Sequence, residues 1–449
     1  MVFKDLDGLV PLPVTLARER QLALTDTADR VVAEALRSYE QYIANHRQVD
    51  ARLWKHVKSR EKVHVYRTRR ADAKKSLELV HARQVSRPRL LSNETIERQQ
   101  RQAHAAGRPH GFTPDDEDAS FLERSAGKDD SGTSRSHSST HSSSSDTGAF
   151  CVFPEESVLE KVKPPQVPLV TAIGTIDGHI EDVAFGALAH TDDAWFKRNS
   201  YVKNDGFDGR KVLASFQAPT EEDPFRYVGI KWATRPIAAF ASRRDLLFLE
   251  SSGIALDSDG ERVYYSLAHS VELDECPLLP DWCNVVRMNL SVCFIMRQTS
   301  ETQIEVYARG YADMGGNLPA VVGLSVFSQG IVDVVGIVEA SYLKKLVYRL
   351  SCHRAANVPA SGATANACSV CHKSTKRFGK LIQTGGTCAI CRQLICQKCS
   401  VQKKLLLDVK ENIQRQLTFC VSCVITTRKL SAWDVAVAQL QLEQGQQQQ

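Results

Sequence analysis

The segment CAICRQLICQKCS, residues 388–400, carries two Cys-x-x-Cys pairs separated by four residues. Two further pairs flank it, Cys368/Cys371 and Cys420/Cys423, so that eight cysteines fall within 56 residues. A two-residue gap lets both sulfurs of a pair reach one ion, and thiolates are soft ligands that suit tetrahedral zinc. Because each zinc takes four ligands, the four pairs predict two structural zinc ions with all eight cysteines as ligands.

Eight thiolates would fill both ions, which excludes a catalytic zinc because that needs an open coordination position. Disulfide bonds are the competing use of clustered cysteines, and they form in oxidising compartments. The N-terminal segment carries Asp5 and Asp7, and Pro11 and Pro13 interrupt its apolar run, which is unlike a secretion signal. We therefore expect a cytoplasmic chain whose cysteines are reduced.

Residues 388–400 closely resemble the core of FYVE-type zinc fingers, and the resemblance extends over about 60 residues. It implies a cross-brace, in which the first and third pairs share one ion and the second and fourth share the other. The ligand sets would then be Cys368, Cys371, Cys396 and Cys399 for one zinc, and Cys388, Cys391, Cys420 and Cys423 for the second. A helix after the last pair, including Trp433, fits the same arrangement.

The segment departs from FYVE domains at the site that binds phosphatidylinositol 3-phosphate. Those domains carry a basic, histidine-containing motif around their third cysteine, whereas residues 384–389 here read TGGTCA and have no charge. A phosphate monoester needs cationic donors, so specific recognition of this headgroup is doubtful. A weaker membrane contact remains an expectation, through Phe378, Lys380, Leu381, Ile382 and Arg392. The alternative is that these side chains pack the small zinc core or are solvated.

Other candidate ligands are less well placed. His353 and His372 lie near the finger, but eight thiolates already complete two sites. Five further cysteines lack paired spacing and are expected to be lone thiols: Cys151, Cys276, Cys283, Cys293 and Cys352.

The region from about 150 to 352 alternates strand-like runs with Gly and Asp turns, which predicts an antiparallel sheet. The expected strands are 167–176, 211–217, 226–233, 245–256, 262–273, 288–296 and 303–312, with a helix over 182–196. Asn317 and Pro319 favour a helix start, and that apolar helix is expected to continue to about Leu350. Its window from Leu318 to Val338 contains polar residues and glycines, which favours a buried helix over a membrane span.

This order of elements resembles the START-like helix-grip fold, and residues 263–271 and 308–322 resemble START-like domains found beside FYVE-type fingers in oomycete proteins. The resemblance implies an α+β domain, a curved antiparallel sheet with a long C-terminal helix, with a pocket for a lipid or sterol. An ordinary packed core without a ligand stays open as the alternative.

The remaining chain completes the predicted organisation. Residues 1–85 are expected to be helical, residues 86–149 to be a Ser-rich disordered linker, and residues 353–430 to be the finger, followed by a C-terminal helix or tail over 431–449. Residues 52–89 are rich in Lys and Arg. They indicate either a solvated helix face or attraction to an anionic surface.

Motifs for catalysis are absent from the sequence: there is no Gly-x-Ser-x-Gly, phosphate-binding glycine loop or His-Glu-x-x-His. A net charge of +5 over 449 residues does not indicate nucleic acid, and none is expected as a partner. The sequence therefore predicts a non-catalytic lipid- or membrane-associated adaptor, cytoplasmic and peripheral on endosomal membranes, with a lipid ligand and unidentified protein partners. The alternative is a RING-like ubiquitin ligase or a protein-interaction finger.

Overall fold

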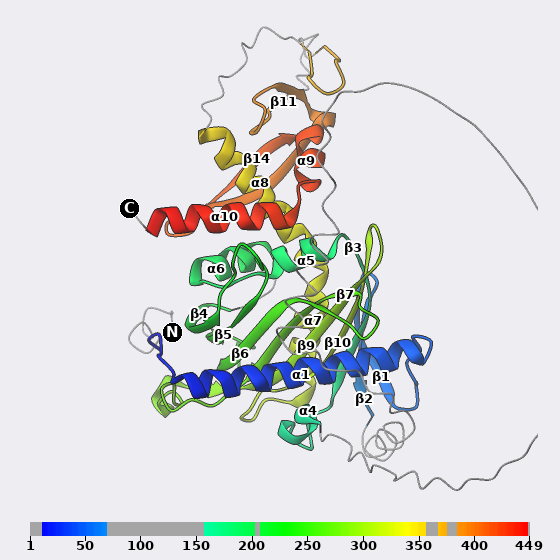
Figure 1. The fold of residues 1–449 in the computed structure, drawn as a ribbon, viewed down its shortest axis with the longest axis vertical. Coiled ribbons are helices and arrows are strands. Elements are labelled where there is room, and N and C mark those ends of the chain that lie inside the picture. The colour runs from blue at the N-terminus through cyan, green and yellow to red at the C-terminus, as the bar shows by residue number, and fades with distance from the viewer. Residues whose placement is uncertain (1–10, 70–156, 203–206, 356–366, 375–383, 448–449) are drawn as a thin grey trace, which may run out of the picture. The chain divides into compact units, whose positions relative to one another are not determined.

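The computed structural model describes residues 11–69, 157–202, 207–355, 367–374 and 384–447 (Figure 1). The described residues form one compact unit, which includes both the sheet and the cysteine-rich part. The predicted Ser-rich linker, residues 86–149, lies outside the described residues.

A ten-stranded sheet organises this unit, and its main path runs β1-β2-β3-β10-β9-β7-β6-β5-β4, with β8 beside β6. All pairings are antiparallel except that of β6 with β8. The strands are β1 (Trp54–Arg60), β2 (Val63–Thr68), β3 (Val170–Asp177), β4 (Gly209–Gln217), β5 (Tyr227–Arg235), β6 (Arg243–Leu256), β7 (Arg262–Ser270), β8 (Val285–Arg287), β9 (Asn289–Ser300) and β10 (Gln303–Asp313).

Side-chain alternation along the strands builds a separate core on each face of this sheet. On β7, Val263, Tyr265 and Leu267 belong to one core, and Tyr264 belongs to the opposite one. Because successive side chains of a strand point to opposite faces, a strand with apolar residues in both phases must be covered on both sides.

Helix α1 (Arg18–Ala44) covers the first face, crossing the strands as Figure 1 shows. Its buried residues Leu24, Ala28, Val31, Ala35 and Tyr39 recur every three or four positions, which places them on one side of the helix. They pack on Leu247, Leu249 and Ile295 of the sheet, among others. This apolar burial fixes α1 to the sheet.

Four longer helices lie on the second face, and a short helix, α4 (Val158–Val162), precedes β3. The four helices of the second face are α5 (Ile180–Ala187), α6 (Asp192–Tyr201), α7 (Ala320–Val332) and α8 (Ile337–Ala355). The side chain of Thr191 caps α6 by accepting from the backbone N–H of Ala194 at 3.1 Å. Phe327 and Ile331 of α7 pack with Val65, Val170 and other residues of the sheet. An α+β sheet followed by long helices is the START-like architecture that the sequence implied.

Three expectations need correction. Residues 54–68 are not helical: they form β1 and β2, and these strands join the main sheet, so the START-like part begins well before residue 150. The helix expected over 182–196 is two helices, α5 and α6, separated near Leu188. The long apolar helix is interrupted by a 3₁₀ turn at Asp333–Gly336, where Arg60 pairs with Asp333 at 2.5 Å.

By length and hydropathy, Ala320–His353 could cross a membrane, with 39% of its most apolar window buried. Buried core helices meet the same criteria, and both α7 and α8 contribute residues to the cores described here.

The cysteine-rich part consists of β11 (Thr384–Thr387), β12 (Leu394–Cys396), β13 (Ser400–Asp408), β14 (Ile413–Cys420), α9 (Val421–Arg428) and α10 (Ala432–Gln447). Its core is shared with α8, because Leu343, Leu346 and Leu350 pack with Ile390, Phe419 and their neighbours. A boundary at residue 352 therefore cuts through one hydrophobic cluster.

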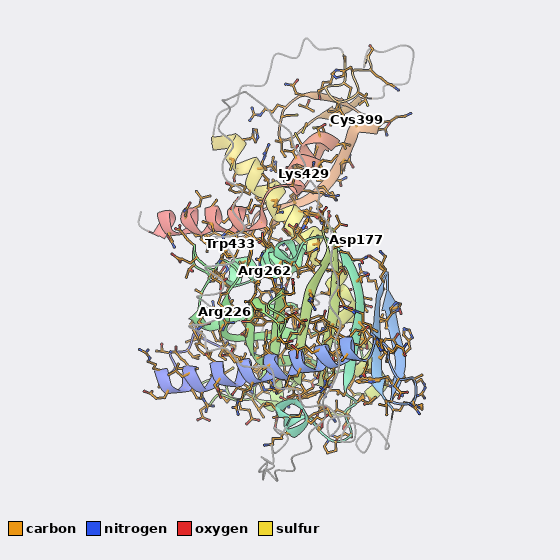
Figure 2. The ribbon with its side chains drawn as sticks, turned by 45° about the vertical axis from the view of Figure 1, so that its right-hand side comes forward. Asp177, Arg226, Arg262, Cys399, Lys429 and Trp433 are labelled. Carbon is orange, nitrogen blue, oxygen red and sulfur yellow. The ribbon has the colours of Figure 1, made fainter. Side chains whose placement is uncertain are left out.

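Helix α10 occupies the expected C-terminal helix region and packs back against the sheet domain. Val435 and Ala436 join the cluster of α5 residues Ile180 and Val183. Trp433, labelled in Figure 2, meets Phe225 edge to face, with the ring centroids 5.4 Å apart. The C-terminal helix thus belongs to the packing of the START-like part as well as to the finger.

Candidate metal sites

The four Cys-x-x-Cys pairs meet in two groups. Cys368, Cys371, Cys396 and Cys399 form the first tetrad, and Cys388, Cys391, Cys420 and Cys423 form the second. Within each tetrad the sulfur atoms all lie within 4.8 Å of one another. The pairing of first with third and second with fourth is the predicted cross-brace, and four convergent thiols are a donor set that fits a tetrahedral metal ion.

Two equivalent turns present the first and second pairs. In each turn the residue after the second cysteine donates its N–H to the carbonyl of the first: His372 to Cys368, and Arg392 to Cys388, both at 2.9 Å. Both donors have φ of +56°, a left-handed conformation that side chains seldom adopt. The repeated geometry aims both sulfurs of each pair toward the same point.

Backbone amides also support the sulfurs. Cys388 Sγ accepts from the N–H of Cys420 at 3.2 Å, and Cys420 Sγ accepts from the N–H of Cys423 at 3.2 Å, which caps α9. A hydrogen bond from the thiol of Cys423, itself a proposed ligand of the same ion, and backbone donors that include the N–H of Cys420 lower the pKa of Cys388. Donors around a sulfur stabilise the thiolate, the form that binds metal.

A short strand separates the second and third pairs and sends them to different tetrads. Between Cys391 and Cys396 the chain forms β12, which pairs antiparallel with β11. Ile395 of β12 is fully buried, so the strand is anchored in the finger core while Cys396 emerges beside Cys371. The four-residue spacing is thus enough to reach from one site to the other.

The tetrads are not disulfide-bonded. The sulfur atoms of Cys371 and Cys396 lie 3.7 Å apart, and those of Cys391 and Cys420 lie 3.9 Å apart. A disulfide needs about 2.05 Å. Among the described residues, neither His353 nor His372 belongs to a tetrad.

The structure describes four of the five lone cysteines and one of the five predicted lipid contacts. Cys276, Cys283 and Cys293 are buried and Cys352 is exposed, and none of them joins a tetrad. Arg392 is exposed. Cys151 and four of the predicted lipid contacts, Phe378, Lys380, Leu381 and Ile382, lie outside the described residues.

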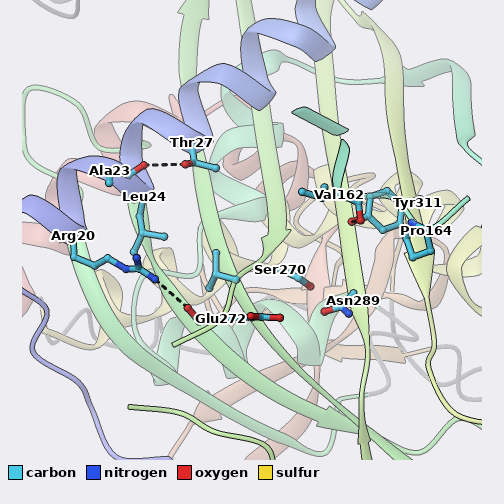
Figure 3. A pocket seen from close by; sticks show the side chains of 11 residues that line it. Arg20, Ala23, Leu24, Thr27, Val162, Pro164, Ser270, Glu272, Asn289 and Tyr311 are labelled. Carbon is cyan, nitrogen blue, oxygen red and sulfur yellow. Dashed lines mark hydrogen bonds between the residues drawn. The ribbon is translucent and has the colours of Figure 1, made fainter. Parts of the chain in front are cut away.

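A pocket of about 470 Å³ opens on the α1 face of the sheet (Figure 3). Its walls mix charged, polar and apolar side chains, among them Arg20, Leu24, Thr27, Glu272, Asn289 and Tyr311. Arg20 donates to the backbone carbonyl of Glu272 across it at 3.3 Å. A lipid pocket between the sheet and the long C-terminal helix would lie on the other face, so this pocket is not the one that the resemblance implies.

The face beneath α5–α8 contains buried ion pairs that the sequence did not reveal. Lys231 is fully buried, bonds Glu250 at 2.8 Å, and has its ammonium 4.9 Å from the ring centre of Trp195. Lys345 bonds Asp182 at 2.6 Å. Lysine and carboxylate residues read as surface groups in a sequence, so only the near-continuous apolar run of β5, which is typical of a strand covered on both faces, could have indicated that Lys231 is buried.

His269 is a buried titratable group beneath α1, where its Nδ1 lies 2.8 Å from the hydroxyl of Ser291. Burial lowers the pKa of His269, with the nearby charge of Glu34 acting in the opposite direction. The unfolded chain takes up this proton near pH 6.5 and the folded chain only at lower pH, so the free energy of unfolding should fall as pH decreases through that value. Urea denaturation at pH 7 and pH 5 should show a smaller decrease for His269→Gln than for the unaltered chain. An equal decrease in both proteins would mean that other groups cause the acid sensitivity.

Comparison with known proteins gives a limited result. No family model matches the chain, and no curated protein matches it. Among solved structures, the chain is similar to human STARD10 (11% identity, 67% of this chain and 78% of that chain, TM-score 0.33). It is also similar to human StAR-related lipid transfer protein 5 (15% identity, 69% and 96%, TM-score 0.32) and to the human StarD13 (DLC2) lipid transfer and protein localization domain (12%, 68% and 95%, TM-score 0.33). The strand order of the sheet and the packing of the helices on its two faces define the fold independently of these similarities.

Proposed function

We propose that this protein is a non-catalytic, lipid- or membrane-associated adaptor, in which a START-like helix-grip domain is joined to a FYVE-like finger with two structural zinc ions. The observation that carries the proposal is the pair of all-cysteine tetrads in cross-brace connectivity. Four soft thiolates per site favour zinc over hard cations and leave no ligand position for a substrate. The finger is therefore a structural scaffold, and any binding by it would involve its outer surface and not the metal ions.

In this proposal the finger is attracted to anionic membranes by charge and does not recognise the headgroup of phosphatidylinositol 3-phosphate. Strand β11, which stands where FYVE domains carry their basic motif, is Thr-Gly-Gly-Thr and offers no cation. Arg392 is exposed nearby and would supply a single charge. One guanidinium can attract an anionic surface, whereas selective binding of a phosphate monoester takes several converging donors.

Co-sedimentation of the full chain with vesicles tests this function. Vesicles of phosphatidylcholine are compared with vesicles that also contain phosphatidylserine or phosphatidylinositol 3-phosphate at matched charge. We expect similar binding to both anionic vesicles and weaker binding to the neutral ones. Preference for the phosphoinositide would contradict the reading of β11 and make the protein an endosomal effector. Absence of vesicle binding, together with absence of co-purified lipid, would overturn the lipid-associated function and leave a protein-interaction finger.

Ubiquitin transfer distinguishes the adaptor from a ligase, because a RING-like surface would recruit a conjugating enzyme. The adaptor predicts no autoubiquitination when the zinc-loaded chain is mixed with activating and conjugating enzymes. The peripheral, cytoplasmic location belongs to the same proposal.

A further inference from the structure

Helix α7 has a surface unlike that of an ordinary solvent-facing helix. Its sequence, Ala320–Val332, contains no Asp, Glu, Lys or Arg. The inner side buries Phe327, Ile331 and Val332, but Val321 is 78% exposed, and Ser325 and Gly330 are exposed as well. A helix at a water interface normally places charged residues on its outer side. The outer side of α7 is therefore apolar or neutral over its whole length.

The β1–β2 hairpin, which is in contact with α7, has the opposite character. Residues 54–69 contain six Lys or Arg residues and a single acid, Glu61. They form the edge of the sheet, and both strands contact α7. These residues are the described part of the basic run 52–89. For that run the sequence allowed two interpretations, a solvated helix face or attraction to an anionic surface.

The register of the hairpin shows on which face its cations lie. Lys58 is directly opposite Val65, and Lys55 is directly opposite Arg67. Opposed residues of an antiparallel pair share a face, and Val65 is buried in the core that holds Phe327 of α7. The side chains of Lys55, Lys58 and Arg67 therefore extend on the α7 side of the sheet.

One basic residue of this face is already used. Arg60, opposite Val63, pairs with Asp333 at the end of α7 and fixes the helix to the hairpin. Among the described residues, the structure records no ion pair for Lys55 or Lys58. Two lysines thus border an uncharged helix surface without a carboxylate partner in the described part of the chain.

From this juxtaposition we infer that the outer side of α7, with Lys55, Lys58 and Arg67 of the hairpin, is the surface on which the protein docks to an anionic lipid bilayer. An uncharged helix surface with an exposed valine and bordering cations suits the boundary between acyl chains and anionic headgroups. Long lysine stems can lie along the apolar boundary while their ammonium groups reach the phosphates. The inference rests on the proposed lipid association and assigns it to the START-like part instead of the finger loop.

Lysines on an edge strand have a second use, since they discourage pairing with another sheet. That use accounts for the charges on β1 but not for the absence of charge on α7. Membrane docking predicts that a substitution on α7 alone weakens vesicle binding, whereas protection of the sheet edge predicts no effect. An experiment on α7 therefore separates the two explanations.

The test uses the full chain and vesicles of phosphatidylcholine with or without phosphatidylserine. Basic residues near an anionic surface contribute favourably to binding, so Lys55→Glu/Lys58→Glu should weaken binding by on the order of tenfold or more. Val321→Asp should also weaken binding, and because Val321 is exposed in the first turn of the helix, we expect the variant to remain folded. Thermal denaturation of both variants checks that they remain folded.

Matched controls carry the same charge changes elsewhere. Lys404→Glu/Lys410→Glu alters two exposed lysines of the β13–β14 hairpin, and Leu442→Asp alters an exposed position of α10. We expect both controls to bind like the unaltered chain. Equal loss in the controls would reduce the effect to net charge and overturn the inference, as would unchanged binding of the Lys55/Lys58 and Val321 variants.

Mass spectrometry of co-purified lipid separates this inference from the proposed function. If the unaltered chain binds vesicles and the variants do not, both stand. If vesicle binding persists in all variants, only the docking surface is wrong. If the unaltered chain neither carries lipid nor binds vesicles, the lipid-associated function itself fails.

Discussion

Removing the metal is expected to unfold the finger and to release α10 from the sheet domain. Metal binding supplies on the order of 10 kcal/mol to a module of this kind, which exceeds what its small core can provide. The effect should spread because Cys420 caps α9 and α9 leads directly into α10. Trp433 would then leave Phe225, and the amides of α10 should exchange much faster with solvent.

Hydrogen exchange and metal analysis of the full chain check this prediction together. The native chain should release two equivalents of zinc to a chelator, and exchange should rise over residues 384–447 while β6, β7 and β9 stay protected. Cys391→Ser should reproduce the change, whereas Cys352→Ser, an exposed thiol outside both tetrads, should not. Unaltered protection of the finger after complete metal loss would show that the tetrads are not folding-coupled metal sites.

Removing the Asp182 carboxylate is expected to destabilise the chain by about 3–5 kcal/mol, because it leaves the ammonium of Lys345 buried without its counter-charge. Asp182 accepts from Lys345 and from Ser341 of α8, each at 2.6 Å. Lys345 also donates to the carbonyl of Leu430 at 2.7 Å. One carboxylate therefore stabilises the contact of α5 with α8 and, through Lys345, the segment before α10.

Urea denaturation of Asp182→Ala measures this cost, and the double variant Asp182→Leu/Lys345→Met is the informative comparison. Replacing both charges by apolar groups should recover much of the loss, since no unpaired charge remains. As a control, Asp26→Ala removes an exposed pair with Arg30 on α1 and should change the free energy of unfolding by less than about 1 kcal/mol. A double variant that is as unstable as the single one would mean that the hydroxyl of Ser341, not the charge of Lys345, depends on Asp182.

The tetrads were predictable from the sequence because ligand spacing is a local property. Two residues between cysteines set the turn, and the resemblance to FYVE-type fingers, not the spacing alone, implied which pairs share an ion. The strands from Lys211 to Ala312 were predictable for a similar reason, since their alternation and turn residues are local signals.

The hairpin at residues 54–68 was missed because its many lysines and arginines favoured a helix, although Val63, Val65 and the residues between them alternate in the manner of a strand. The break between α7 and α8 could not be foreseen, because Asp333 is held there by Arg60 from a strand 273 positions earlier. Contacts of α10 with Phe225 are likewise tertiary and leave no trace in either segment alone.

The passage of α8 from the core of the sheet domain into the core of the finger has a consequence for recombination. Exchanging fingers between related proteins at the end of α8 would pair Leu343, Leu346 and Leu350 with a foreign set of partners, while an exchange at the start of α8 would remove Lys345 from Asp182. Neither junction is neutral. A successful chimaera would have to transfer α8, the finger and α10 together with the matching surface of α5. We therefore expect the sheet domain and the finger to be inherited together and to change in step.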